Sequence, residues 1–160
     1  MNHQKTPRNV IVVGASAGGV EALIQFFGEL PADLAAAVLV VLHIPSSTPS
    51  QLAPILARAT RLPVKPGVDL EEILPGQVYV ASADRHLMVD GNQFRITRGP
   101  RESRSRPSIG GHLLGDQREA ERAGLCRDVL SPAAGAVGAL ERCFSHVWQR
   151  EQRRRCCQAL

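Results

Sequence analysis

The 160-residue chain lacks any run of 18 consecutive apolar residues, so its sequence does not predict a transmembrane helix. Residues 1–9 form a polar lead without the apolar centre of a secretion signal. No internal repeat or long low-complexity linker is present. Because 44% of the residues are hydrophobic, the composition predicts one globular domain with its own core, located in the cytoplasm without membrane insertion.

Metal-binding and nucleic-acid-binding signatures are also missing. The four cysteines (Cys126, Cys143, Cys156 and Cys157) lack the C-x₂-C spacing typical of zinc sites. The formal net charge is +4, and eleven of the 19 basic residues lie after Gly99, all of them arginines. No DNA- or RNA-binding motif accompanies these arginines, and a basic terminal run of this kind is usually solvated. The sequence therefore predicts neither a metal cofactor nor a nucleic-acid partner.

A glycine-rich segment near the N-terminus matches neither G-x-G-x-x-G nor the lysine-bearing P-loop. It reads Gly14-Ala15-Ser16-Ala17-Gly18 and directly follows the apolar run Val10–Val13. A strand, a sharp turn and a helix beginning at Ser16 would expose the serine hydroxyl as a nucleophile, with the Ala17 amide facing the oxyanion. An alternative is a plain strand-to-helix turn in which Ser16 caps the helix.

A histidine follows the next apolar run. Ala35 to Leu42 is almost uninterrupted apolar sequence, which is typical of a strand buried on both faces of a parallel sheet, and His43 comes next. Parallel strands joined by a helix end at the same edge of the sheet, about 4.8 Å apart if they are neighbours. We therefore expect His43 to lie beside Ser16, where an imidazole could take the serine proton. The alternative is a strand-end histidine bonded to a nearby carbonyl.

The remaining chain up to residue 98 alternates between helical and extended patterns. Its expected elements are a helix with apolar positions at Val20, Leu23, Ile24, Phe27 and Leu30, a second helix after Thr48-Pro49, a strand at Val78–Val80, and a hairpin over 86–98. The hairpin is predicted from Asp90-Gly91-Asn92, a strong turn signal between two extended segments. His86, which begins that hairpin, is expected to be structural.

Several segments together resemble the catalytic domain of CheB-type protein-glutamate methylesterases. The first are Ile11 to Leu23, Leu30-Pro31 and Val40 to Pro45; those that follow in the same order are Leu74 to Ala81, Arg85 to Leu87 and Arg104 to Ile109. The resemblance covers about residues 10–109, and collinear segments are more diagnostic than any single motif.

The resemblance implies an α/β fold with a doubly wound, mostly parallel, Rossmann-like three-layer sheet. It implies a cytoplasmic serine hydrolase that removes methyl esters from glutamates of chemoreceptors and, in some members, deamidates glutamine. Ser16 matches the family's nucleophile and His43 its general base, with the backbone amide of Ala17 as the oxyanion donor. No cofactor is implied. The implied partners are methylated receptor helices, with the sensory kinase or methyltransferase of the pathway.

One part of the family's pattern has no match here. The triad aspartate of the family lies in a late Gly-Met-x-x-Asp-Gly loop, and no such segment follows Ile109. Asp116 and Asp128 are the only later aspartates, and neither lies in a glycine loop, so we assign neither a catalytic role. Loss of the orienting carboxylate lowers turnover about 10⁴-fold in a triad hydrolase. A catalytically silent, truncated binding module is therefore the alternative function, and a small-anion-binding domain is a third.

The sequence divides into three parts on this reading. Residues 1–9 are the polar lead, residues 10–109 match the methylesterase domain, and residues 110–160 form a tail without resemblance to the family. The tail begins at Gly110-Gly111-His112 and holds all four cysteines. We hypothesise that it arises from a frameshifted or misjoined reading frame. An uninterrupted coding sequence with no family-like continuation in another frame would reject this origin.

Overall fold

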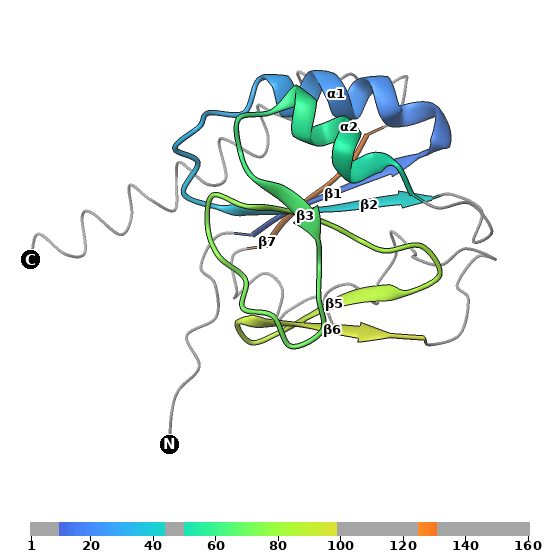
Figure 1. Ribbon diagram of the computed structural model, residues 1–160, viewed down its shortest axis with the longest axis vertical. Helices are drawn as coiled ribbons and strands as arrows, with labels where there is room; N and C mark the ends of the chain where they lie inside the picture. Colours follow the sequence, from blue (N-terminus) through green and yellow to red (C-terminus); the bar gives the residue numbers. More distant parts are fainter. Residues whose placement is uncertain (1–9, 44–49, 99–124, 131–160) are drawn as a thin grey trace, which may run out of the picture.

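The computed structural model describes residues 10–43, 50–98 and 125–130. Its main element is a five-stranded sheet in which every neighbouring pair is parallel, with the strand order β3-β4-β2-β1-β7 (Figure 1). The strands are β1 (Val10–Ser16), β2 (Ala37–His43), β3 (Val64–Pro66), β4 (Val78–Val80) and β7 (Leu125–Leu130). The sheet is open, and the predicted parallel α/β fold is confirmed.

Two helices cover one face of this sheet. A 3₁₀ turn (Ala17–Gly19) leads into α1 (Val20–Gly28), and α2 (Leu52–Ala59) packs beside α1 (Figure 1). Alternate strand residues face the helices, because successive side chains of a strand point to opposite faces. The resulting core cluster includes Ile11, Val13, Val38, Val40, Leu23, Phe26, Phe27 and Leu56. This packing fixes β1 and β2 from the helix side.

A β-hairpin covers the opposite face in the described part of the chain. Its strands are β5 (His86–Asp90) and β6 (Gln93–Thr97), and Figure 1 shows them as a separate layer below the sheet. The second core cluster joins the other alternate strand residues to the hairpin: Val10, Val12, Ala37, Leu39, Val41, Tyr79, Leu87 and Phe94. Both faces of β1 and β2 are therefore buried, which explains why β2 reads as a continuous apolar run.

The predicted hairpin and second helix are present with small shifts in their bounds. Gly91 has φ of +60°, and Asn92 does not have a positive φ, as in a type II′ turn, which favours glycine at its first central position. Pro54 lies in the first turn of α2, where a missing N–H interrupts no helical hydrogen bond. The Ser50 hydroxyl accepts a hydrogen bond from the Leu52 amide at 3.3 Å. The proposed start at Thr48-Pro49 lies outside the described residues.

Two strands were not predicted. β3 is a three-residue edge strand that contains a proline, and proline is tolerated at a sheet edge. β7 contains Arg127 and Asp128, which interrupt its apolar pattern, yet it pairs with β1 in parallel. The strand order reverses at β1, since β2 lies on one side of it and β7 on the other, as in a doubly wound sheet.

No helix among the described residues is long and apolar enough to cross a membrane.

Candidate active site

The two residues proposed from the sequence end neighbouring strands. Ser16 is the last residue of β1, His43 is the last residue of β2, and the parallel register pairs them directly. Neighbouring strands lie about 4.8 Å apart, a backbone separation at which a serine hydroxyl and an imidazole on paired residues can form a hydrogen bond. His43 lies within the strand, whereas the sequence predicted a strand that stops at Leu42. The backbones of the proposed nucleophile and base are thus adjacent at the carboxyl edge.

This edge is also where the strand order reverses. β7 pairs with β1 up to the Ala15–Leu130 pair, so the pairing with β7 ends one residue before Ser16. On its other side Ser16 is still paired with His43 of β2. In open α/β sheets, connections diverge at such a switch point and leave a crevice outside the carboxyl ends of the strands. Ser16 therefore lies where this class of fold binds its ligands.

The turn after Ser16 differs from the prediction in one respect. The 3₁₀ turn begins at Ala17, but α1 begins only at Val20, with Gly19 as its N-cap residue and no side-chain capping bond. A helix beginning at Ser16 was therefore wrong, because a separate turn intervenes. Ser16 is not the N-cap of α1, but it directly precedes the 3₁₀ turn, so a cap on that turn stays the alternative prediction for its hydroxyl. The first amides of a helical turn have no acceptor within the turn, so the Ala17 amide is suited to donate to an oxyanion.

Gly18 leaves open space beside this turn. It is exposed, and a Cβ atom placed on it meets no described atom within 4 Å. Among the described residues, no close approach between backbones requires a glycine at this position.

The strands that carry the site are rigidly packed. Val13 and Ala15 of β1 and Val41 of β2 are completely buried between the helix layer and the hairpin layer. Functional groups on strands held in this way keep their positions more precisely than groups on loops. The scaffold thus fixes the backbone positions of Ser16 and His43 independently of the connections that leave them.

A further connection reaches the same edge from β4. The Ala81 amide donates to the Val40 carbonyl at 2.9 Å, and the chain then passes through Asp84, whose φ is +59°, into β5. The Asp84 carboxylate lies 3.4 Å from Nη2 of Arg98. Sequence reasoning missed this pair, since its members lie on different elements and no motif links them. His86 is buried at the start of β5, and its structural role stays a prediction.

Of the other residues considered from the sequence, the structure describes the backbone of Asp128. Asp128 lies within β7 at the level of Val13, and it follows no glycine loop. Asp116, the Arg104–Ile109 segment and three of the cysteines lie outside the described residues. Among the residues that the structure describes, no group of three or more histidine, cysteine, aspartate or glutamate side chains could hold a metal ion.

Known proteins match this chain over most of its described part. The sequence profile of the family described as CheB methylesterase matches residues 11–121, which extends past Ile109 into the segment assigned to the tail. A protein-glutamate methylesterase/protein-glutamine glutaminase 2 of Rhizobium johnstonii is 38% identical over 109 residues, which cover 66% of this chain and 30% of that protein. A protein-glutamate methylesterase/protein-glutamine glutaminase 1 of Geobacter metallireducens is 37% identical over 115 residues, which cover 68% and 31%.

A solved structure has the same fold. The crystal structure of the Thermotoga maritima CheB methylesterase catalytic domain matches with a TM-score of 0.66 and 24% identity, over 87% of this chain and 76% of that chain. The match supports the open α/β architecture. The chain spans only about 30% of the length of the curated relatives that it matches.

Proposed function

Because the chain belongs to the CheB methylesterase family, we propose that it carries the nucleophile and base of a serine hydrolase that removes methyl esters from glutamates of chemoreceptors. The observation that carries this proposal is the pairing of Ser16 with His43 at the carboxyl ends of two neighbouring parallel strands. The names of the relatives include a glutaminase activity, so deamidation of receptor glutamine is part of the proposal.

The proposed reaction is an acyl transfer through a covalent intermediate. His43 takes the proton of the Ser16 hydroxyl while the serine oxygen attacks the ester carbonyl. The Ala17 amide donates to the oxyanion of the tetrahedral intermediate. The intermediate collapses, and methanol leaves with the proton held by His43. Water then attacks the acyl-serine with the help of the same imidazole, which releases the free glutamate and restores the serine.

The orienting carboxylate decides between the two leading functions. In a serine triad this group holds the imidazole in the productive tautomer, and its loss lowers turnover about 10⁴-fold without abolishing catalysis. No segment of this chain matches the family's aspartate loop. That observation favours the second candidate, a catalytically silent module that binds the receptor. For either function we propose a cytoplasmic location and methylated receptor helices as the partner, with kinase or methyltransferase components of the pathway nearby.

Release of labelled methanol tests the proposal directly. The purified chain is incubated with a receptor carrying radiolabelled methyl esters, beside a Ser16→Ala variant and a Ser50→Ala variant. Ser50 lies before α2, where its hydroxyl accepts a bond from the Leu52 amide, so its variant removes a serine hydroxyl to which the proposed reaction assigns no role. We expect release by the wild type and by Ser50→Ala but none by Ser16→Ala. Receptor binding without methanol release would favour the silent module, and release by Ser16→Ala would contradict the assigned nucleophile.

A further inference from the structure

The connection from β4 to β5 borders the proposed active site on the side away from Ser16. β2 lies between β1 and β4 in the sheet. Along the edge formed by the carboxyl ends of the strands, Ser16 is therefore followed by His43 and then by the residues after Val80. The hydrogen bond from the Ala81 amide to the Val40 carbonyl holds the start of this connection against β2, three residues before His43. Residues 82–85 therefore continue beside the end of β2.

Asp84 holds an uncommon conformation within this connection. Its φ of +59° lies in the left-handed region, which is strained for residues other than glycine and which aspartate and asparagine tolerate best. Its side chain is only 23% exposed, although it lies in a surface connection. A strained, partly buried aspartate indicates that the surrounding contacts determine its position.

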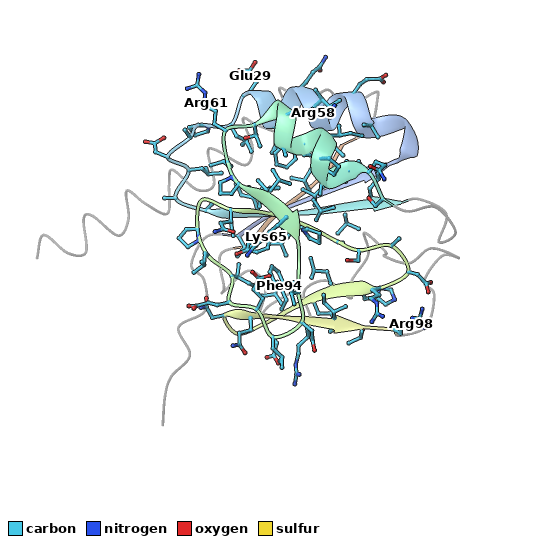
Figure 2. All side chains as sticks on the ribbon, in the orientation of Figure 1. Glu29, Arg58, Arg61, Lys65, Phe94 and Arg98 are labelled. Atoms are coloured by element: carbon cyan, nitrogen blue, oxygen red, sulfur yellow. The ribbon has the colours of Figure 1, made fainter. Side chains whose placement is uncertain are left out.

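Arg98 supplies one of these contacts from the hairpin layer. It follows the last residue of β6, and Figure 2 shows it at the open end of the hairpin, opposite the β5–β6 turn. Its Nη2 atom lies 3.4 Å from the Asp84 carboxylate, and its side chain is 67% exposed. The ion pair thus ties the connection after β4 to the end of β6. It joins the sheet edge to the layer that covers the opposite face.

We propose that Asp84 is a positioning residue of the active site: paired with Arg98, it holds the β4–β5 connection beside His43 as one wall of the substrate site. The inference rests on the proposed function. Asp84 acts through the connection and exchanges no proton with the substrate. Because the Arg98 side of the pair is largely exposed, the pair is a weak restraint, and its removal should slow reaction at Ser16 only about two- to fivefold.

The same hairpin offers a matched control at its other end. Arg95 Nε lies 3.4 Å from the Asp90 carboxylate, with the same residue types at the same separation. Asp90 and Arg95 adjoin the turn between β5 and β6, away from the carboxyl edge of the sheet. Removing this second pair alters the surface charge of the hairpin equally but leaves the β4–β5 connection unchanged.

The experiment measures the rate at which a fluorophosphonate labels Ser16. Asp84→Asn keeps a residue that tolerates the left-handed conformation and removes only the charge. Asp84→Asn and Arg98→Ala are compared with Asp90→Asn and Arg95→Ala, with Ser16→Ala as the background. We expect the first two to slow labelling two- to fivefold and the control pair to leave it unchanged. Arg98→Lys should restore most of the rate.

Two further readouts separate positioning from a general loss of stability. High salt screens exposed charges, so it should slow the wild type toward the rate of Asp84→Asn and leave that variant unaffected. Hydrogen exchange should become faster at residues 81–86 and 41–43 in Asp84→Asn but not in Asp90→Asn. Wild-type labelling that Asp84→Asn and Arg98→Ala leave unchanged would overturn this inference alone. Absence of Ser16 labelling in the wild type would overturn the proposed function and this inference with it.

Discussion

Replacing Tyr79 by phenylalanine removes a single oxygen from the centre of the second core cluster. Tyr79 is fully buried in β4, and its ring meets that of Phe94 edge-on at a centroid distance of 4.7 Å. Its hydroxyl accepts a hydrogen bond from the Leu74 amide at 3.1 Å and donates one to the Glu72 carbonyl at 3.3 Å. The hydroxyl therefore ties the connection between β3 and β4 to the sheet, while the ring fills the core.

The expected cost follows from these two bonds. A buried group left without its partner costs about 1–3 kcal/mol, whereas the net contribution of an ordinary hydrogen bond is about 1 kcal/mol. Leu74 is 42% exposed, so water can reach its backbone after the substitution and reduce the cost. We expect Tyr79→Phe to lower the free energy of unfolding by about 1–3 kcal/mol, with the ring packing preserved.

Urea denaturation followed by circular dichroism measures this difference. The slope of the free energy of unfolding against urea concentration (the m-value) should be unchanged, since the variant exposes almost the same surface on unfolding. Hydrogen exchange at the Leu74 amide should become faster in the variant. A midpoint within error of the wild type, or a more stable variant, would refute the claim that the hydroxyl stabilises this connection.

Three other changes test the described packing and charge. Phe94→Ala should lower the free energy of unfolding by about 3–5 kcal/mol in urea titrations, because it empties the contact between hairpin and sheet. Gly76→Ala should cost about 1–2 kcal/mol and lower the melting temperature, because Gly76 has φ of +75°. Burial raises the pKa of Tyr79, and the hydrogen bond to Glu71 raises the pKa of Lys65. Both groups bind their protons more tightly in the folded protein, so their contribution to the free energy of unfolding is complete below about pH 10. This contribution is lost as the pH rises through the pKa values of the folded state. Urea titrations in which the free energy of unfolding does not fall above about pH 10 would contradict this.

The parts of the fold that sequence predicted are those with strong local signals. The apolar run of β2 reflects burial on both faces, and the helical spacing of α1 reflects burial on one face. Within α1 one predicted core position was wrong, since Ile24 is 39% exposed and Phe26 is buried instead. The hairpin follows from the conformation that Gly91 allows. Ser16 and His43 could be placed together because parallel strands joined by a helix end at the same edge. No side-chain contact was needed for that inference.

The parts that sequence missed depend on contacts between distant segments. β7 contains two charged residues, so its sequence lacks the apolar run or alternation that predicts a strand. Its pairing with β1 joins segments that are far apart in the chain. β3 is short and carries Pro66, so the chain reads there as a connection. The Asp84–Arg98 pair joins residues on two separate elements, and only the arrangement of the layers brings them together. The start of α1 was misplaced because a 3₁₀ turn and a helix begin with similar residues.

A double-mutant cycle on methanol release tests most directly whether Ser16 and His43 act as one unit. Residues that share a single proton transfer show strongly non-additive effects, because removing either one abolishes the same step. We therefore predict that Ser16→Ala, His43→Ala and the double variant all fall to the background measured without protein. Methanol release that survives His43→Ala, or losses that multiply in the double variant, would contradict the account.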